Sequence, residues 1–236
     1  MPVELGLGLV WYAVFVISTT FHEAAHAFAA LKLGDPTAHR AGLATLDPVP
    51  HIQRSPLGMI AVPIVTFLLA RGGWMIGWAS TPYDPYWAQA NRKKAAWMAL
   101  AGPAANLALI LVAAGAIRLG MSLGLFVEPL ESTWTQVTVA RSPGMATSAA
   151  VVVSVLFSLN LILLVFNLLP LPPLDGSEIL VLFLGSRTAE RYREFMAQPA
   201  IGMIGLIVAW NVIGVILGPV RALALNLLYP GAEYHY

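Results

Sequence analysis

Residues 5–31 read LGLGLVWYAVFVISTTFHEAAHAFAAL, an apolar run in which Glu23 is the one acidic residue and lysine and arginine are absent. A bilayer core is about 30 Å thick and takes about 20 apolar residues in a helix, so this run is long enough to cross a membrane. A secretory signal would begin with basic residues and end in a small-residue cleavage site, and neither feature is present here. We therefore expect residues 5–31 to remain as a membrane span.

Four further apolar runs follow along the chain, at residues 55–70, 95–117, 142–174 and 195–220. The sequence of 236 residues is 58% hydrophobic and 11% charged, whereas a soluble domain carries about 25% charged residues. The runs predict an all-α fold, a polytopic membrane helix bundle of about five to six hydrophobic segments. We expect one integral-membrane domain over residues 1–236. Residues 37–53 carry a weak signal for a short β-hairpin.

The composition excludes one class of partner and limits the side chains that could bind a metal ion. Lysine and arginine total 13 and acidic residues total 12, which gives a net charge of +1. A chain without a basic field does not hold nucleic acid by counterion release, so we expect no nucleic-acid partner. Cysteine is absent, so a metal ion would have to be bound by histidine, aspartate or glutamate.

Lysine and arginine also indicate the orientation of the runs, because basic residues collect in cytoplasmic connections. Residues 32–54, 71–94 and 185–194 are basic, whereas two arginines in residues 118–141 are balanced by two glutamates. Both flanks of the second run are therefore basic, and we expect residues 55–78 to enter the membrane and return as a re-entrant segment. A plain span would instead place one basic connection outside.

A charged pattern inside the first run points to a metal site. His22, Glu23 and His26 form an HExxH pattern within a stretch of good helix formers. Residues four apart lie on one face of a helix, so both imidazoles can reach one zinc ion while Glu23 faces the water beside it. Chance matches to HExxH occur on soluble helices, but at membrane depth such side chains are costly unless they are paired or coordinated. We therefore expect a metal site here.

A second polar stretch, FNLLPLPPLDG at residues 166–176, ends the longest charge-free run. Its prolines and glycine break the helix, and non-helical backbone at membrane depth is tolerated where it lines a wet cavity. The Asp175 carboxylate would complete a zinc site of two histidines and one carboxylate, with the fourth position left for water. The alternative is that Asp175 caps the helix that follows it.

Other polar residues leave alternatives open. Rival third ligands are His39, Asp47, His51 and Glu178. We expect His51 to be a surface histidine, because no apolar run forces its loop inward. Asn167 would either hold the substrate backbone or the developing oxyanion, or form a hydrogen bond between helices. Asn106 lies among small residues, where close helix packing is the expected role.

HEAAH at residues 22–26, AGPAAN at residues 101–106 and NLLPLPPLDG at residues 167–176 occur in this order, each on an apolar run. Together they resemble the site-2 protease family of intramembrane zinc metalloproteases, M50, over most of the chain from about residue 5 to about residue 185. Better-studied members often carry a PDZ or CBS domain, and the connections here are too short for either. The chain therefore resembles a minimal form of the family.

The resemblance implies that His22, His26 and Asp175 bind Zn2+. It also implies that Glu23 is the general base and that Asn167 lies near the scissile peptide bond. The implied substrate is a transmembrane protein, cut within or near its membrane segment. The implied location is a bacterial plasma membrane, with the active site towards the cytoplasmic side.

Two other functions are left open by the residues alone. One is a membrane zinc-binding or zinc-transport protein without proteolytic activity, and the other is a scaffold without catalysis. Transport would need polar residues along a path through the membrane, and outside the two polar stretches the runs are nearly bare. A scaffold would tolerate substitution of Glu23. The sequence does not indicate an oligomeric state.

Overall fold

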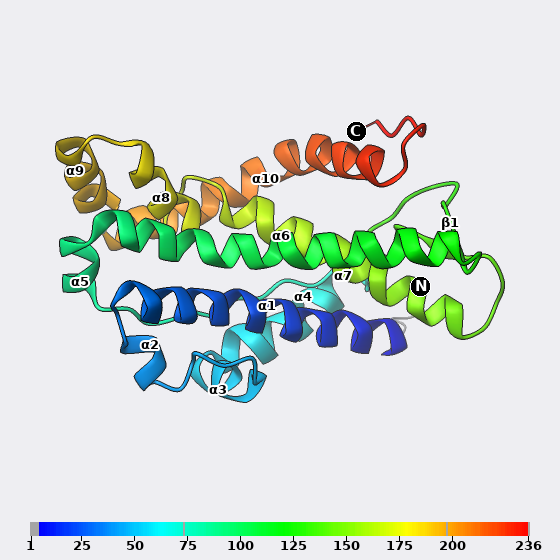
Figure 1. The fold of residues 1–236 in the computed structure, drawn as a ribbon, viewed down its shortest axis with the longest axis horizontal. Helices are drawn as coiled ribbons and strands as arrows, with labels where there is room; N and C mark the ends of the chain where they lie inside the picture. The colour runs from blue at the N-terminus through cyan, green and yellow to red at the C-terminus, as the bar shows by residue number, and fades with distance from the viewer. Residues whose placement is uncertain (1–4, 73, 197, 236) are drawn as a thin grey trace.

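The computed structural model describes residues 5–72, 74–196 and 198–235, and most of them are helical (Figure 1). Four helices are long and apolar enough to cross a membrane: α1 (Leu5–Leu33), α6 (Arg92–Ser122), α7 (Met145–Asn167) and α10 (Pro199–Leu228). A bent helix pair would make a fifth if it is counted as one span. The predicted all-α polytopic membrane bundle is therefore confirmed.

Shorter elements connect these spans. They are α2 (Thr37–Arg40), α3 (Pro48–Arg54), the π-helix η1 (Leu57–Ala61), α4 (Val62–Leu69), α5 (Pro85–Ala90), β1 (Phe126–Val127), β2 (Val139–Ala140), α8 (Asp175–Ile179), the 3-10 helix η2 (Leu180–Phe183) and α9 (Ser186–Met196). The two strands pair antiparallel, with Phe126 opposite Ala140. They lie in the connection between the end of α6 and the start of α7.

The prediction of a β-hairpin within residues 37–53 is wrong, because this stretch forms α2 and all of α3 except its last residue. The Asp47 carboxylate accepts a hydrogen bond from the amide of Val49 at 2.9 Å and so caps α3. Pro48 follows at the first helical position, where its missing N–H costs nothing. Capping chemistry therefore outweighs the weak strand pattern.

Helices α1, α6 and α7 form the core of the bundle, and α6 packs along both of the others (Figure 1). Trp11 and Phe15 of α1 are fully buried and share one apolar cluster with Leu159 of α7. On its other side α7 contributes Phe157 to a second cluster with Ile117 of α6. This three-helix core supports the residues of the site.

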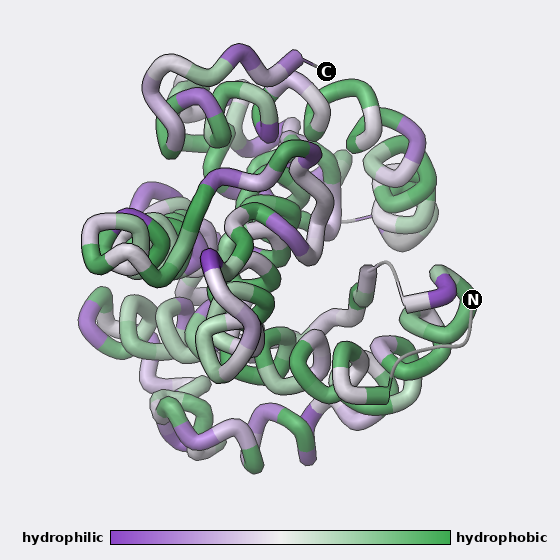
Figure 2. Tube along the Cα trace, turned by 90° about the vertical axis from the view of Figure 1, so that its right-hand side faces the viewer, coloured by the Kyte–Doolittle hydropathy of each residue, from purple (hydrophilic) through white to green (hydrophobic). Residues whose placement is uncertain are grey.

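Helix α10 is the most exposed of the four spans, since 11% of its most apolar window is buried, against 50% for α7. Most of its exposed side chains are apolar, among them Met203, Ile207 and Val215. Hydrophobic turns face outward around much of the bundle (Figure 2). Such a surface suits contact with lipid tails. The chain here forms one continuous helix through Pro219, long enough for a single span.

The segment between α3 and α5 enters the bundle and returns. Helix α3 and the continuous η1–α4 helix are bent by 110° at their junction. Beyond α4 the chain is extended, and the Trp78 amide donates to the Gly58 carbonyl at 3.1 Å. Arg54 Nε donates to the Ser80 carbonyl at 2.9 Å. The chain thus comes back beside its starting point. The bent pair has the geometry of either a broken span or a re-entrant loop, so the re-entrant segment stays a prediction.

Asp35 connects the stretch that follows α4, residues 74–84 (the returning chain), to the end of α1 through hydrogen bonds. Its carboxylate is 1% exposed and accepts hydrogen bonds from the Thr37 hydroxyl, the Thr37 amide and, at 2.9 Å, the Asp84 amide. Burial raises the pKa of Asp35, but the hydrogen bonds to its charged form outweigh burial and hold the pKa below its usual range. The connection therefore keeps its charge and its shape at neutral pH.

Basic residues gather at one end of the bundle. The end of α1, the start of α6 and helix α9 lie together there, on the left of Figure 1. Lys32 is in the last turn of α1, Arg92 begins α6 and Arg193 is in the last turn of α9. Connections that are distant in the sequence thus form one basic face.

Candidate metal centre

Helix α1 carries the three residues of the HExxH pattern, and His22, Glu23 and His26 are buried with 6% to 7% of each residue exposed. The two imidazole rings lie edge to face, with their centroids 4.6 Å apart. Their Nε2 atoms are 3.0 Å apart. A separation of four residues on one helix therefore brings the two ring nitrogens together, as the sequence predicts.

Asp175 joins these histidines from a distant part of the chain. Its Oδ2 lies 3.1 Å from Nε2 of His22, and its Oδ1 lies 3.3 Å from Nε2 of His26. The ligand atoms of the three residues all lie within 4.8 Å of one another. The capping alternative is wrong, since the N-cap of α8 is Leu174 and no side chain caps this helix.

Gly176 explains how Asp175 reaches this position. A Cβ at Gly176 would collide with the carbonyl oxygens of Leu168 and Leu169, which follow the end of α7. The absence of a side chain therefore lets α8 fold back against the chain that leaves α7. The proline-rich break between the two helices makes this reversal.

Both histidines use their second ring nitrogen as a hydrogen-bond donor. Nδ1 of His26 donates to the Met98 carbonyl at 2.8 Å, and Nδ1 of His22 donates to Oδ1 of Asn106 at 2.6 Å. A neutral ring that is protonated on Nδ1 carries a lone pair on Nε2. Two lone pairs and the oxygens of Asp175 therefore converge, and acceptors in such contact repel one another unless a cation lies between them. Two nitrogens and a carboxylate with an open fourth position are a catalytic zinc ligand set.

Gly102 allows α6 to approach the two rings. A Cβ at this position would lie 2.6 Å from Cε1 and from Nε2 of His22, and it would also collide with Nε2 of His26. Small residues generally permit close contact between helices. Gly102, the glycine of the AGPAAN motif, is in addition needed to make room for the two rings of the candidate metal centre.

We expect Gly102→Ala to displace the two rings and to lower zinc affinity by at least about tenfold, comparable to other changes in the surroundings of a metal site. Zinc titration of the purified protein against a chromogenic chelator measures this. Gly115→Ala is the matched control, because it lies on the same helix and a Cβ there meets no atom within 4 Å. Equal zinc affinity in the two variants would contradict the close approach of α6.

The returning chain holds the carboxylate of Glu23. The Thr81 hydroxyl lies 2.7 Å from Oε2 of Glu23 and 3.0 Å from the Glu23 carbonyl. Thr81 belongs to the extended stretch that follows the re-entrant segment and is 58 residues from Glu23 in the sequence. No pattern in the sequence pairs these two residues, so sequence analysis did not identify Thr81.

The rival third ligands lie outside the cluster. The prediction of a surface histidine at position 51 is wrong, because His51 is 2% exposed and its Nε2 lies 3.1 Å from a backbone carbonyl. Asp47 caps α3, Glu178 forms an ion pair at 3.0 Å, and His39 is in α2. Among the described residues, the group that could hold a metal is the cluster of two histidines and Asp175.

Two asparagines differ from what the sequence suggested. Asn167 is the last residue of α7 and is half-buried, and within the described ranges its side chain makes no hydrogen bond, so the alternative of a bond between helices is not observed there. Asn106 is fully buried and contacts His22 directly. The prediction of a packing role for Asn106 is therefore incomplete, because the motif AGPAAN alone does not indicate which way its amide points.

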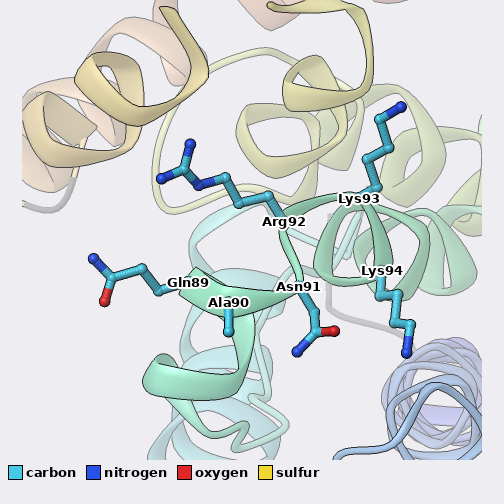
Figure 3. A pocket seen from close by; sticks show the side chains of 6 residues that line it. All are labelled: Gln89, Ala90, Asn91, Arg92, Lys93 and Lys94. Carbon is cyan, nitrogen blue, oxygen red and sulfur yellow. The ribbon is translucent and has the colours of Figure 1, made fainter. Parts of the chain in front are cut away.

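A shallow cavity of about 480 Å³ opens where α5 meets α6 (Figure 3). It is lined by Gln89, Ala90, Asn91, Arg92, Lys93 and Lys94. None of these residues belongs to the metal-ligand cluster. The cavity forms part of the basic face described above and does not form part of the candidate centre.

A helical membrane protein in which a buried HExxH helix meets a distant aspartate is a membrane zinc metalloprotease by class. The chain belongs to Peptidase family M50, whose profile matches residues 10–211. The resemblance found from the motifs is thereby confirmed. Zinc is the metal of this class, and its donor set agrees with the nitrogen and carboxylate atoms that converge here.

The chain is similar to YwhC of Bacillus subtilis (strain 168), with 33% identity over 177 residues that cover 74% of this chain and 69% of YwhC. It is 28% identical to Rip2 of Mycolicibacterium smegmatis, over 73% of this chain and 56% of Rip2. It is 31% identical to Rip2 of Mycobacterium tuberculosis (strain Erdman), over 72% of this chain and 56% of that protein. All three carry the name "putative zinc metalloprotease". No solved structure matches the chain.

Proposed function

We propose that the chain is a site-2-type endopeptidase that hydrolyses a peptide bond within or near the transmembrane segment of another membrane protein. The observation that carries the proposal is the depth of the cluster. His22 and His26 lie 11 and seven residues before the end of α1, which is about 10 to 16 Å along a helix at 1.5 Å per residue. A peptide bond would have to reach this depth, and one in a membrane segment is already there.

The residues of the cluster would have different roles in hydrolysis. His22, His26 and Asp175 would hold the zinc, and Glu23 beside them would take the proton of the attacking water and pass it to the leaving amine. Bound zinc supplies a Lewis acid for the scissile carbonyl and lowers the pKa of water. Asn167 would hold the substrate backbone or the developing oxyanion with its amide, which has no partner among the described residues.

The hydroxyl of Thr81 sets the orientation of the base. It donates to one oxygen of Glu23, Oε2, at 2.7 Å. The second oxygen of the carboxylate is thereby free to accept a proton. Since a hydroxyl is uncharged, it orients the carboxylate without neutralising it. The chain would act as one membrane domain over residues 1–236, because residues from α1, the returning chain and α8 all contribute to the site.

The basic face indicates the orientation in the membrane. Basic residues collect on the cytoplasmic side, and the basic end of this bundle is also the end nearer to the metal cluster along α1. We therefore infer that the site opens towards the cytoplasmic side of a bacterial plasma membrane. The cut would accordingly fall in the cytoplasmic half of the substrate's membrane segment.

Cleavage in liposomes tests the proposal. The purified chain is reconstituted with a panel of single-span bacterial membrane proteins, with and without a zinc chelator, and the products are mapped by mass spectrometry. We expect chelator-sensitive cuts inside the apolar segment or within a few residues of it. Cuts confined to the soluble tails would contradict the intramembrane assignment. Zinc passage into vesicles without proteolysis would favour the alternative of a zinc transporter.

A further inference from the structure

A chain of buried amides leads from helix α7 to the metal centre. Asn160 of α7 is fully buried, and its Nδ2 donates to the Leu156 carbonyl at 2.8 Å and to the Ser18 hydroxyl at 2.9 Å. A backbone carbonyl can only accept a hydrogen bond, so the nitrogen of the Asn160 amide must face Leu156. The oxygen of this amide therefore faces away from it.

The orientation of Asn160 determines the next amide. Oδ1 of Asn160 accepts a hydrogen bond from Nδ2 of Asn106 at 2.9 Å. Asn106 is fully buried as well, and no other orientation pairs its nitrogen with an acceptor at this contact. Oδ1 of Asn106 must then face His22, where it lies 2.6 Å from Nδ1. An acceptor at this distance requires a proton on Nδ1 of His22.

We propose that Asn160 is a positioning residue that acts through Asn106 to keep the proton of His22 on Nδ1 and thereby leaves Nε2 free to bind the metal. This inference rests on the proposed role of His22 as a zinc ligand. The chain of hydrogen bonds that sets this orientation begins at the Leu156 carbonyl, passes through the two amides on different helices and ends at Nδ1 of His22. Neither asparagine needs to contact the metal.

The alternative arrangement shows why this orientation matters. If the Asn106 amide turned over, its nitrogen would donate to Nδ1 of His22, and the ring proton would move to Nε2. That nitrogen would then point a proton at the metal position and could no longer bind. Both asparagines of the network are fully buried among the spans, and the partners of a ligating histidine strongly affect metal affinity.

Two substitutions at Asn160 separate positioning from packing. Asn160→Leu removes the acceptor for Asn106, so the Asn106 amide is free to turn over, and we expect zinc affinity to fall about tenfold to 100-fold. Asn160→Asp in its neutral form, which burial at membrane depth favours, keeps a donor for the Leu156 carbonyl and an acceptor oxygen for Asn106, so we expect zinc affinity within about threefold of the wild type. Ser158→Ala is the control for a change on the same helix, because the Ser158 hydroxyl is buried and makes no hydrogen bond within the described ranges.

Zinc affinity is measured by competition with a chromogenic chelator. Proton and nitrogen NMR of histidine-labelled, metal-free protein reports the second quantity, the Nδ1–H of His22, which a 2.6 Å hydrogen bond shifts strongly downfield. We expect this resonance in the wild type, in Asn160→Asp and in Ser158→Ala, and its loss in Asn160→Leu. Thermal unfolding of each variant shows whether the bundle remains folded.

The outcomes distinguish this inference from the proposed function. If the wild type binds zinc and Asn160→Leu keeps both the affinity and the resonance, the positioning role is overturned while the metal site stands. Equal losses in Asn160→Leu and Asn160→Asp would also overturn it, since packing would then explain the effect. If the folded wild type binds no zinc, the proposed function fails, and the NMR comparison still tests the orientation of the two amides.

Discussion

Replacing Glu23 with glutamine is expected to abolish measurable peptide-bond hydrolysis while the protein keeps its zinc. Glutamine has the same shape and can still contact the Thr81 hydroxyl, which donates to Glu23 at 2.7 Å, but it cannot take a proton from water. Loss of a general base lowers rates by about 100-fold to 10,000-fold. The rate of cleavage of one membrane substrate in liposomes, together with zinc content by mass spectrometry, measures both quantities.

Glu131→Gln is the matched control for this substitution. Glu131 is exposed and lies between β1 and β2, at the opposite end of the bundle from the basic face. Both variants should contain as much zinc as the wild type, and only Glu23→Gln should lose activity. Retained cleavage in Glu23→Gln would transfer the role of base to another group. Absence of cleavage by the wild type as well would agree with a scaffold without catalysis.

Replacing Asp175 with asparagine is expected to remove most of the bound zinc. The carboxylate of Asp175 contacts both ring nitrogens, at 3.1 Å and 3.3 Å, and it supplies the only negative charge among the three candidate ligands. Changes to residues that surround a metal site lower metal affinity by about 10-fold to 100-fold. Loss of a ligand itself should lower zinc affinity by more than this. Zinc titration of the purified variant measures the change.

Asp47→Asn provides the same chemical change at a distant position. Asp47 caps α3, and asparagine is an equally good N-cap residue, so this variant should keep the fold and the zinc. Unchanged zinc affinity in Asp175→Asn would assign the third ligand to another residue. Reduced zinc in both variants would instead indicate a general effect of the substitution on the fold.

Much of the fold was readable from the sequence because membrane spans are determined by composition along one segment. The four spanning helices lie where the apolar runs are, and a helix satisfies its own backbone hydrogen bonds at membrane depth. The pair His22 and His26 was readable for the same reason, since one helix fixes the spacing between them. Asp175 was identified from the combination of a carboxylate with a broken helix.

Two predictions from local patterns are wrong, for different reasons. The hairpin expected at residues 37–53 is instead a pair of short helices, one of them capped by Asp47. His51 was expected at the surface but is buried, because it lies in α3, which packs against α1. The hairpin pattern was outweighed by capping within the same stretch, whereas the position of His51 was decided by packing against another helix.

The sequence by itself therefore determined the class of fold, the helix that carries His22 and Glu23, and the chemistry of the candidate metal ligands. Only the tertiary structure decided that Thr81 would hold Glu23 and that Asn160 would orient Asn106 towards the metal centre. The physical reason is that hydropathy and helical spacing act along one segment. The direction of a buried hydrogen bond, in contrast, depends on donors and acceptors that different helices bring together.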